Sequence, residues 1–135
     1  KDVFKRIVFI EYAHYFIDDY LRKHLSGWIN EMLSFYFFER FQKVNFAERD
    51  ISAFSFNVIK NMKKQIKNRI VFKQIFFQIS LFAYFIETKF KSNFWLTFLR
   101  KLKKSVMNPE KLIKKMTQKS FEELYFLMIR SKLNL

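Results

Sequence analysis

Residues that form tight turns are almost absent from this chain, which has one glycine and one proline among 135 residues. Two-residue β-hairpins depend on glycine, asparagine or similar residues with positive φ angles, so an all-β fold would need far more of them. Half of the residues are hydrophobic, which is enough to bury a core in a chain of this length. The sequence therefore predicts an all-α fold in which residues 1–135 form a single compact domain of about six helices.

The net charge of +14 has two competing explanations. Clustered lysine and arginine side chains bind phosphates by displacing counterions, so the basic stretches 60–73 and 100–119 indicate a module that binds nucleic acid or another anionic surface. Alternatively, phenylalanine, lysine, isoleucine and asparagine share A/T-rich codons, and a biased genome produces the same composition without any binding function. We expect the basic stretches to lie on the surface of separate helices, without forming one continuous stripe.

The absence of cysteine excludes a disulfide framework and a thiolate metal site, and it leaves the redox compartment undetermined. The longest uncharged run, residues 74–86, falls short of the ~20 residues that cross a bilayer. Lys1 and Asp2 do not open a signal peptide, so no transmembrane or targeting segment is expected. A chain that starts at Lys1 rather than at methionine is expected to be a fragment of a larger protein.

Apolar residues recur every three to four positions along most of the chain, as they do on one face of a helix. The stretch from Ile70 to Phe90 is the most apolar and is expected to form the most buried helix. The first helix is expected to be largely buried, and the helix that starts at Asp50 to be amphipathic with its lysines outward. The expected helical segments are 2–16, 28–41, 50 to about 62, 68–90, 92–104, 108–118 and 120 onward.

The last three helix starts carry capping signals. Ser92 and Asn108 are expected N-caps, because their short side chains can accept a hydrogen bond from the first-turn backbone. Pro109 suits the first helical position after Asn108. Ser120 and Glu123 have the spacing of a capping box.

The segment IEYAHYF, residues 10–16, contains a glutamate and a histidine three positions apart. A zinc peptidase helix has the pattern His-Glu-x-x-His, in which two histidines on one face bind the metal and the glutamate activates water. Here Glu11 and His14 match this spacing, but Ile10 stands where the first histidine would be. The pattern Glu-x-x-His also occurs in di-iron bundles, which need a second copy of the motif, and the sequence has none.

Glu31 lies seventeen residues after His14. The segment Trp28-Ile29-Asn30-Glu31 resembles the part of gluzincin zinc peptidases that supplies the third zinc ligand. The later segments QISLFAYFIETKFKSNFWLTFLRKLKK and NPEKLIKKMTQKSFEELYFLMIRSKL are similar to subsequent helices of the same group. The resemblance runs in order from Val8 to Leu133, although the glycine that usually follows the third ligand is absent. The chain thus resembles the C-terminal helical half of a gluzincin, a peptidase MA-like enzyme.

This resemblance implies that Glu11 is a vestigial general base and that His14 and Glu31 are vestigial zinc ligands, with Ile10 replacing the first histidine. One imidazole and one carboxylate are too few to hold catalytic zinc, so no cofactor is expected unless another group completes the site. His24 is the only other histidine, and an active zinc metallopeptidase would need it as the replacement ligand. Without the resemblance, His14 reads as a hydrogen-bonded core histidine and Glu31 as a solvated helix residue.

The implied function is a catalytically degenerate zinc-metallopeptidase-like domain with a binding or structural role. In the family the active-site sheet precedes these helices, so a protein partner or an upstream domain is expected to cover the open face of the first helix. The alternative function is a basic helical module that binds nucleic acid or an anionic surface.

Overall fold

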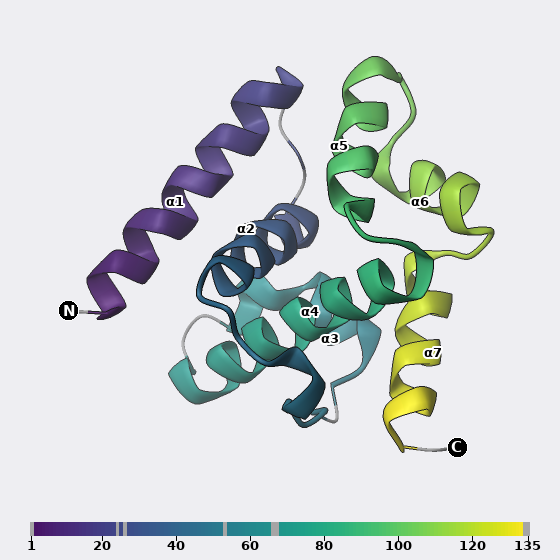
Figure 1. Cartoon of the computed structure of the whole chain (residues 1–135). Coiled ribbons are helices and arrows are strands. Elements are labelled where there is room, and N and C mark those ends of the chain that lie inside the picture. The colour runs from purple at the N-terminus through teal and green to yellow at the C-terminus, as the bar shows by residue number, and fades with distance from the viewer. Residues whose placement is uncertain (1, 24, 26, 53, 66–67, 134–135) are drawn as a thin grey trace. The chain divides into compact units, whose positions relative to one another are not determined.

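A computed structural model describes residues 2–23, 25, 27–52, 54–65 and 68–133, and the regular structure of these residues is entirely helical (Figure 1). No strand occurs among them, which confirms the predicted all-α fold. The chain divides into two compact units, residues 1–83 and 84–135, with the boundary inside one long helix. The helices are α1 (Asp2–Leu21), α2 (Gly27–Phe41), α3 (Phe56–Lys60), α4 (Arg69–Phe90), α5 (Phe94–Lys104), α6 (Pro109–Thr117) and α7 (Phe121–Leu133), with the 3-10 turns η1 (Phe46–Glu48) and η2 (Met62–Gln65).

The core of the first unit is built around α2, which is apolar on most sides and packs against α1 and α3. Its residues Ile29, Met32 and Leu33 are fully buried. Aromatic contacts join α2 to α4 and to α3. The ring of Phe35 lies 5.0 Å from that of Phe76 on α4, and Trp28 meets the ring of Phe56 on α3 edge-on at 5.5 Å. A helix that is hydrophobic nearly all round needs such cover on several faces.

The first helix differs from its prediction in length and in burial. It continues to Leu21 instead of ending near Phe16, because Ile17 and Leu21 are buried in the core. It is also not largely buried. The large apolar side chains that remain exposed on it are Ile7, Val8, Tyr12, Tyr15 and Phe16. α2 packs alongside α1 (Figure 1), yet these five side chains are 50–70% exposed.

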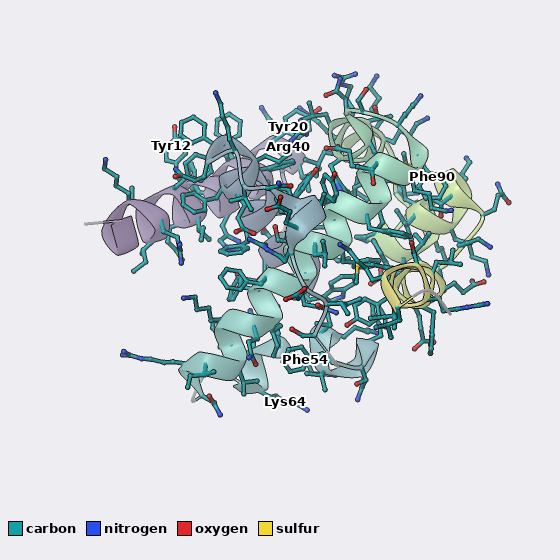
Figure 2. The ribbon with its side chains drawn as sticks, turned by 60° about the horizontal axis from the view of Figure 1, so that its bottom comes forward. Tyr12, Tyr20, Arg40, Phe54, Lys64 and Phe90 are labelled. Atoms are coloured by element: carbon teal, nitrogen blue, oxygen red, sulfur yellow. The ribbon has the colours of Figure 1, made fainter. Side chains whose placement is uncertain are left out.

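The predicted helix from Asp50 is wrong, because α3 begins only after Ser55, whose hydroxyl accepts a hydrogen bond from the amide of Val58 at 3.3 Å. The preceding stretch is held by the buried side chain of Gln78. Its Oε1 accepts a bond from Ser52 N at 2.9 Å, and its Nε2 donates to Ser52 O at 3.0 Å. These bonds satisfy the backbone N–H and C=O groups of Ser52, which would otherwise need hydrogen-bond partners within a helix. The expected outward lysines Lys60, Lys63 and Lys64 are exposed (Lys64 is labelled in Figure 2), and the fourth, Lys67, lies outside the described residues.

A buried ion pair fixes the segment between α2 and α3. Arg49 donates from its two terminal nitrogens to the two carboxylate oxygens of Glu39, at 2.6 and 2.7 Å. The guanidinium also lies over the rings of Phe77 and Phe46, 4.6 and 5.3 Å from their centroids. The Glu39 side chain is 6% exposed, so its charge depends on this single arginine for compensation among the contacts that the structure describes.

The long helix α4 is buried through its middle rather than over the whole predicted range from Ile70 to Phe90. Ile75, Ile79 and Phe82 are fully buried, but Ile70 is 73% exposed. A 22-residue helix is about 33 Å long, so its first turn reaches beyond the residues that pack on its centre. By length and composition α4 is the one helix among the described residues that could cross a membrane, yet half of its most apolar part is buried inside the fold, as in a core helix. It is therefore no clear transmembrane segment.

The second unit has its own core of fully buried side chains, which are Ile86, Trp95, Phe98, Leu102, Ile113, Leu124 and Met128. In this unit α6 packs against both α5 and α7. The ring of Trp95 meets the rings of Phe94 and Phe98 edge-on at 5.1 and 5.4 Å. The one-turn spacing of Trp95, Phe98 and Leu102 on α5 therefore supplies a continuous apolar face.

Two of the three predicted helix starts in this unit are confirmed. Asn108 Oδ1 accepts from Lys111 N at 2.8 Å with Pro109 in the first turn, and Ser120 and Glu123 exchange the two bonds of a capping box at 3.1 and 3.0 Å. The prediction for Ser92 is wrong, since Asn93 takes the cap position with φ of 63° and no capping side-chain bond. Instead the buried carboxylate of Glu87 accepts from Trp95 N at 3.3 Å, so an acidic side chain of α4 serves the start of α5.

Candidate functional site

Two of the residues that the sequence resemblance singles out meet between α1 and α2. His14 Nε2 lies 3.2 Å from Glu31 Oε2, and the two side chains are 19% and 23% exposed. His14 comes from the middle of α1 and Glu31 from the first turns of α2, so the packing of the two helices positions the pair. Glu31 is therefore not a solvated helix residue without partners.

A network of polar side chains continues behind the imidazole. His14 Nδ1 is 2.9 Å from Asn30 Oδ1, which also accepts a hydrogen bond from Ser34 Oγ at 3.1 Å. Asn30 Nδ2 donates to Asp18 Oδ1 at 3.0 Å, and the same carboxylate oxygen accepts from Leu25 N at 3.1 Å. Asn30 is 4% exposed, so the network satisfies an amide that would be costly to bury alone.

Asp18 and Asn30 are neighbours of His14 for which the sequence contains no motif. Their only local signal is spacing, because Asp18 follows His14 by one helical turn and Asn30 immediately precedes Glu31. Asp18 also accepts the hydrogen bond from Leu25 N, in the segment between α1 and α2. Its carboxylate ties the end of α1 to the start of α2.

The network favours one protonation state of His14. The Asp18 carboxylate can only accept, so it orients the Asn30 amide with Nδ2 toward itself and Oδ1 toward the imidazole. Glu31 also presents an acceptor, which means that both ring nitrogens face acceptors and both are used best when they carry protons. Burial lowers the pKa of His14, but the hydrogen bond and charge of Glu31, the bond to Asn30 and the charge of Glu11 together raise that pKa above its ordinary value. The arrangement thus favours an imidazolium.

Glu11 and Ile10 complete the segment that resembles the zinc motif. Glu11 is exposed on α1, and it acts on the imidazole of His14 only through its charge among the effects described for that ring. Ile10 is half-buried one helical turn before His14, on the same side of α1. The position that would hold the first ligand therefore faces the same region as His14 but offers no donor atom.

These residues do not fit a catalytic zinc ion. Two ligands of tetrahedral zinc, each about 2.0–2.1 Å from the metal, lie roughly 3.3 Å apart, which is close to the separation of His14 Nε2 and Glu31 Oε2. However, no three His, Cys, Asp or Glu side chains among the described residues lie close enough together to hold a metal. His24, the replacement ligand considered from the sequence, lies outside the described residues. The site has the spacing of a ligand pair without the number of ligands that zinc needs.

The side of α1 that faces away from α2 carries a second feature. Tyr12 and Tyr15 are 65% and 70% exposed, and the ring of Tyr12 projects to the outside of α1 (Figure 2). On an ideal helix the exposed apolar residues Ile7, Val8, Tyr12, Tyr15 and Phe16 occupy one half of the circumference, roughly 180° wide. We call these five residues the outer face of α1.

Comparisons with protein families, with curated proteins and with solved structures find no match for this chain. The resemblance to gluzincin peptidases therefore stays a prediction from the sequence.

Proposed function

We propose that the chain is a catalytically degenerate gluzincin-like helical domain in which an ion pair has taken the place of the zinc site, and that it serves a binding role. The observation that carries this proposal is the meeting of His14 and Glu31 at 3.2 Å. These are the positions that match the second and third zinc ligands in the family. Their separation is that of two ligands of one metal, which supports a common origin.

Loss of hydrolysis follows from the chemistry of the pair. Zinc is bound by neutral imidazole, whereas the surroundings of His14 raise its pKa and favour the protonated ring. The first ligand position carries Ile10, which has no donor atom. Without a metal, Glu11 has no activated water to deprotonate, so its role as a base is lost.

A binding role is supported by the outer face of α1. Five large apolar side chains are exposed on one half of this helix, and exposed apolar patches can mark sites of association. We propose that a protein partner or an upstream domain covers this face. In gluzincins a sheet precedes the helices, and an upstream domain of that kind would supply such cover.

Zinc calorimetry tests the proposal. The wild-type chain is expected to bind zinc weakly or not at all, and Ile10→His is expected to supply the third ligand and bind one zinc ion per chain. Failure of Ile10→His to bind zinc better than wild type would remove the basis of the proposal.

A further inference from the structure

A pocket of about 590 Å³ lies within the second unit, among the end of α4, α5 and α6. This volume is in the range of small-molecule sites, roughly 300–1,000 Å³. The described residues that line it all belong to the second unit, whereas His14 and Glu31 belong to the first. It is a second candidate site with different chemistry.

The floor of the pocket is apolar. Phe94 and Leu112 contribute from α5 and α6 and are only 3% and 4% exposed, so they are fixed parts of the core. Met116 is half-buried on the same side of α6, one turn after Leu112. Phe90 adds a ring 5.8 Å from that of Phe94. A hydrocarbon chain that covers these side chains would remove apolar surface from water.

The rim of the pocket is basic. Four exposed lysines line it, and they come from different segments: Lys91 follows α4, Lys101 and Lys104 lie one turn apart on α5, and Lys115 lies on α6. None of the described residues that line the pocket is acidic. The surrounding sequence adds to the positive electrostatic potential at the rim, because residues 100–119 include eight lysines and arginines and a single acidic residue, Glu110.

We propose that this pocket binds a medium-chain fatty carboxylate, with the carboxylate at the lysine rim and the hydrocarbon chain on the floor formed by Phe94, Leu112 and Met116. Thr97 and Ser105 also line the pocket and supply hydroxyl groups for the carboxylate. An inorganic anion would leave the apolar floor unused. A nucleic acid would need the exposed lysines but not an apolar pocket between helices.

Calorimetry of the full chain with octanoate, decanoate and dodecanoate, each below its micelle concentration, tests the apolar half of the proposal. Affinity is expected to rise about three- to fourfold per added methylene group until the floor is covered. Decanol, which has the same chain as decanoate without the charge, is expected to bind at least about threefold more weakly. Equal binding of decanol and decanoate, or no dependence on chain length, would overturn the proposal.

Two variants with the same loss of charge test the basic half. Lys101→Gln combined with Lys104→Gln removes two rim lysines and is expected to weaken decanoate binding about three- to tenfold. Lys111→Gln combined with Lys114→Gln removes two exposed lysines of α6 that do not line the pocket, and it is expected to change the affinity less than twofold. All four side chains are exposed, so neither variant is expected to disturb folding. Equal weakening by both variants would contradict a defined site.

Competition of bound decanoate with inorganic phosphate and with a DNA duplex, both at physiological salt, tests two other classes of ligand for this pocket. Neither is expected to displace decanoate. Displacement by phosphate at an affinity similar to that of decanoate would show a simple anion site, and displacement by the duplex would show a nucleic-acid surface. Either result would overturn the fatty carboxylate as the ligand.

Discussion

His14 Nε2 and Glu31 Oε2 lie 3.2 Å apart, so a histidine of α1 and a glutamate of α2 meet as an ion pair across the packed helices. The same two atoms would be separated by a similar distance if they bound one zinc ion. The pair and the metal therefore exclude each other, because zinc requires the neutral imidazole and the ion pair requires the protonated one. This competition gives the site a dependence on pH.

The first prediction concerns that dependence. The pKa of His14 is raised in the folded chain, so its contribution to stability is fully present below the unfolded value of about 6.5 and is lost as the pH rises through the folded pKa. We expect His14→Gln to lower the free energy of unfolding by about 1–3 kcal/mol at pH 5.5 and by less at pH 8.5. Urea unfolding at both pH values measures the difference.

Glu31→Gln provides the control for this prediction. Burial lowers the pKa of His14, and without the Glu31 carboxylate its hydrogen bond and charge no longer offset that effect. The destabilisation by His14→Gln should then no longer be greater at pH 5.5 than at pH 8.5. A destabilisation by His14→Gln that grows from pH 5.5 to 8.5 in the wild-type background would mean that the folded chain holds His14 neutral, contrary to the hydrogen-bond network.

The second prediction concerns the buried pair of Arg49 and Glu39. Arg49→Met leaves a carboxylate that is 6% exposed without its cation, and we expect a loss of about 3–5 kcal/mol in the free energy of unfolding. Arg49→Lys should lower the free energy of unfolding less than Arg49→Met does, because it keeps the charge and loses only the bidentate contact with Glu39 at 2.6 and 2.7 Å. Arg100→Met, at an exposed position of α5, is the control and should change stability by less than about 0.5 kcal/mol. Equal effects of Arg49→Met and Arg100→Met would contradict the structure.

The third prediction concerns Gln78. Gln78→Leu keeps the size of the side chain but removes both bonds to the backbone of Ser52, so we expect a loss of about 1–3 kcal/mol. The amide proton of Ser52 should then exchange faster with solvent than in the wild type. Hydrogen exchange measured by NMR tests this effect, and unchanged protection at Ser52 would show that another group holds the segment.

These contacts show which parts of the structure the sequence could predict. The all-α fold and the caps at Asn108 and Ser120 were predicted correctly, because helix period and capping depend on residues within one or two turns. The start of α3 was missed because Gln78, which holds Ser52, lies 26 residues away in the chain. The cap of α5 was missed because Glu87 supplies it from another helix.

The candidate site could also be predicted from the sequence only in part. The spacing of Glu11, His14 and Glu31 predicts them as candidate site residues, because a motif is a pattern of positions along the chain. The roles of Asp18 and Asn30 depend on how α1 packs on α2, and no local pattern encodes that contact. The prediction that α1 is largely buried was wrong for the same reason, since helical periodicity could not show that one of its two apolar faces is exposed among the described residues.

The fourth prediction concerns the outer face of α1. Tyr12→Lys combined with Tyr15→Lys should reduce binding of the dye ANS, which reports exposed apolar surface, and should change the free energy of unfolding by less than about 0.5 kcal/mol. Phe126→Lys, which replaces an exposed aromatic residue of α7, should leave ANS binding nearly unchanged. A large loss of stability in the tyrosine variant would show that this face packs within the chain and is not free for a partner.

The most direct test of the central claim is zinc binding by Ile10→His. Calorimetry should be performed on wild type, Ile10→His and the double variant Ile10→His with Glu31→Gln, after thermal unfolding has established that all three fold. We expect wild type to bind zinc weakly or not at all, and Ile10→His to bind one ion with an affinity that falls as the pH drops toward 6. The double variant should lose most of that gain, because it lacks the carboxylate ligand. If Ile10→His binds zinc no better than wild type, residues 10, 14 and 31 do not converge on a metal site, and the account of this chain as a degenerate gluzincin is wrong.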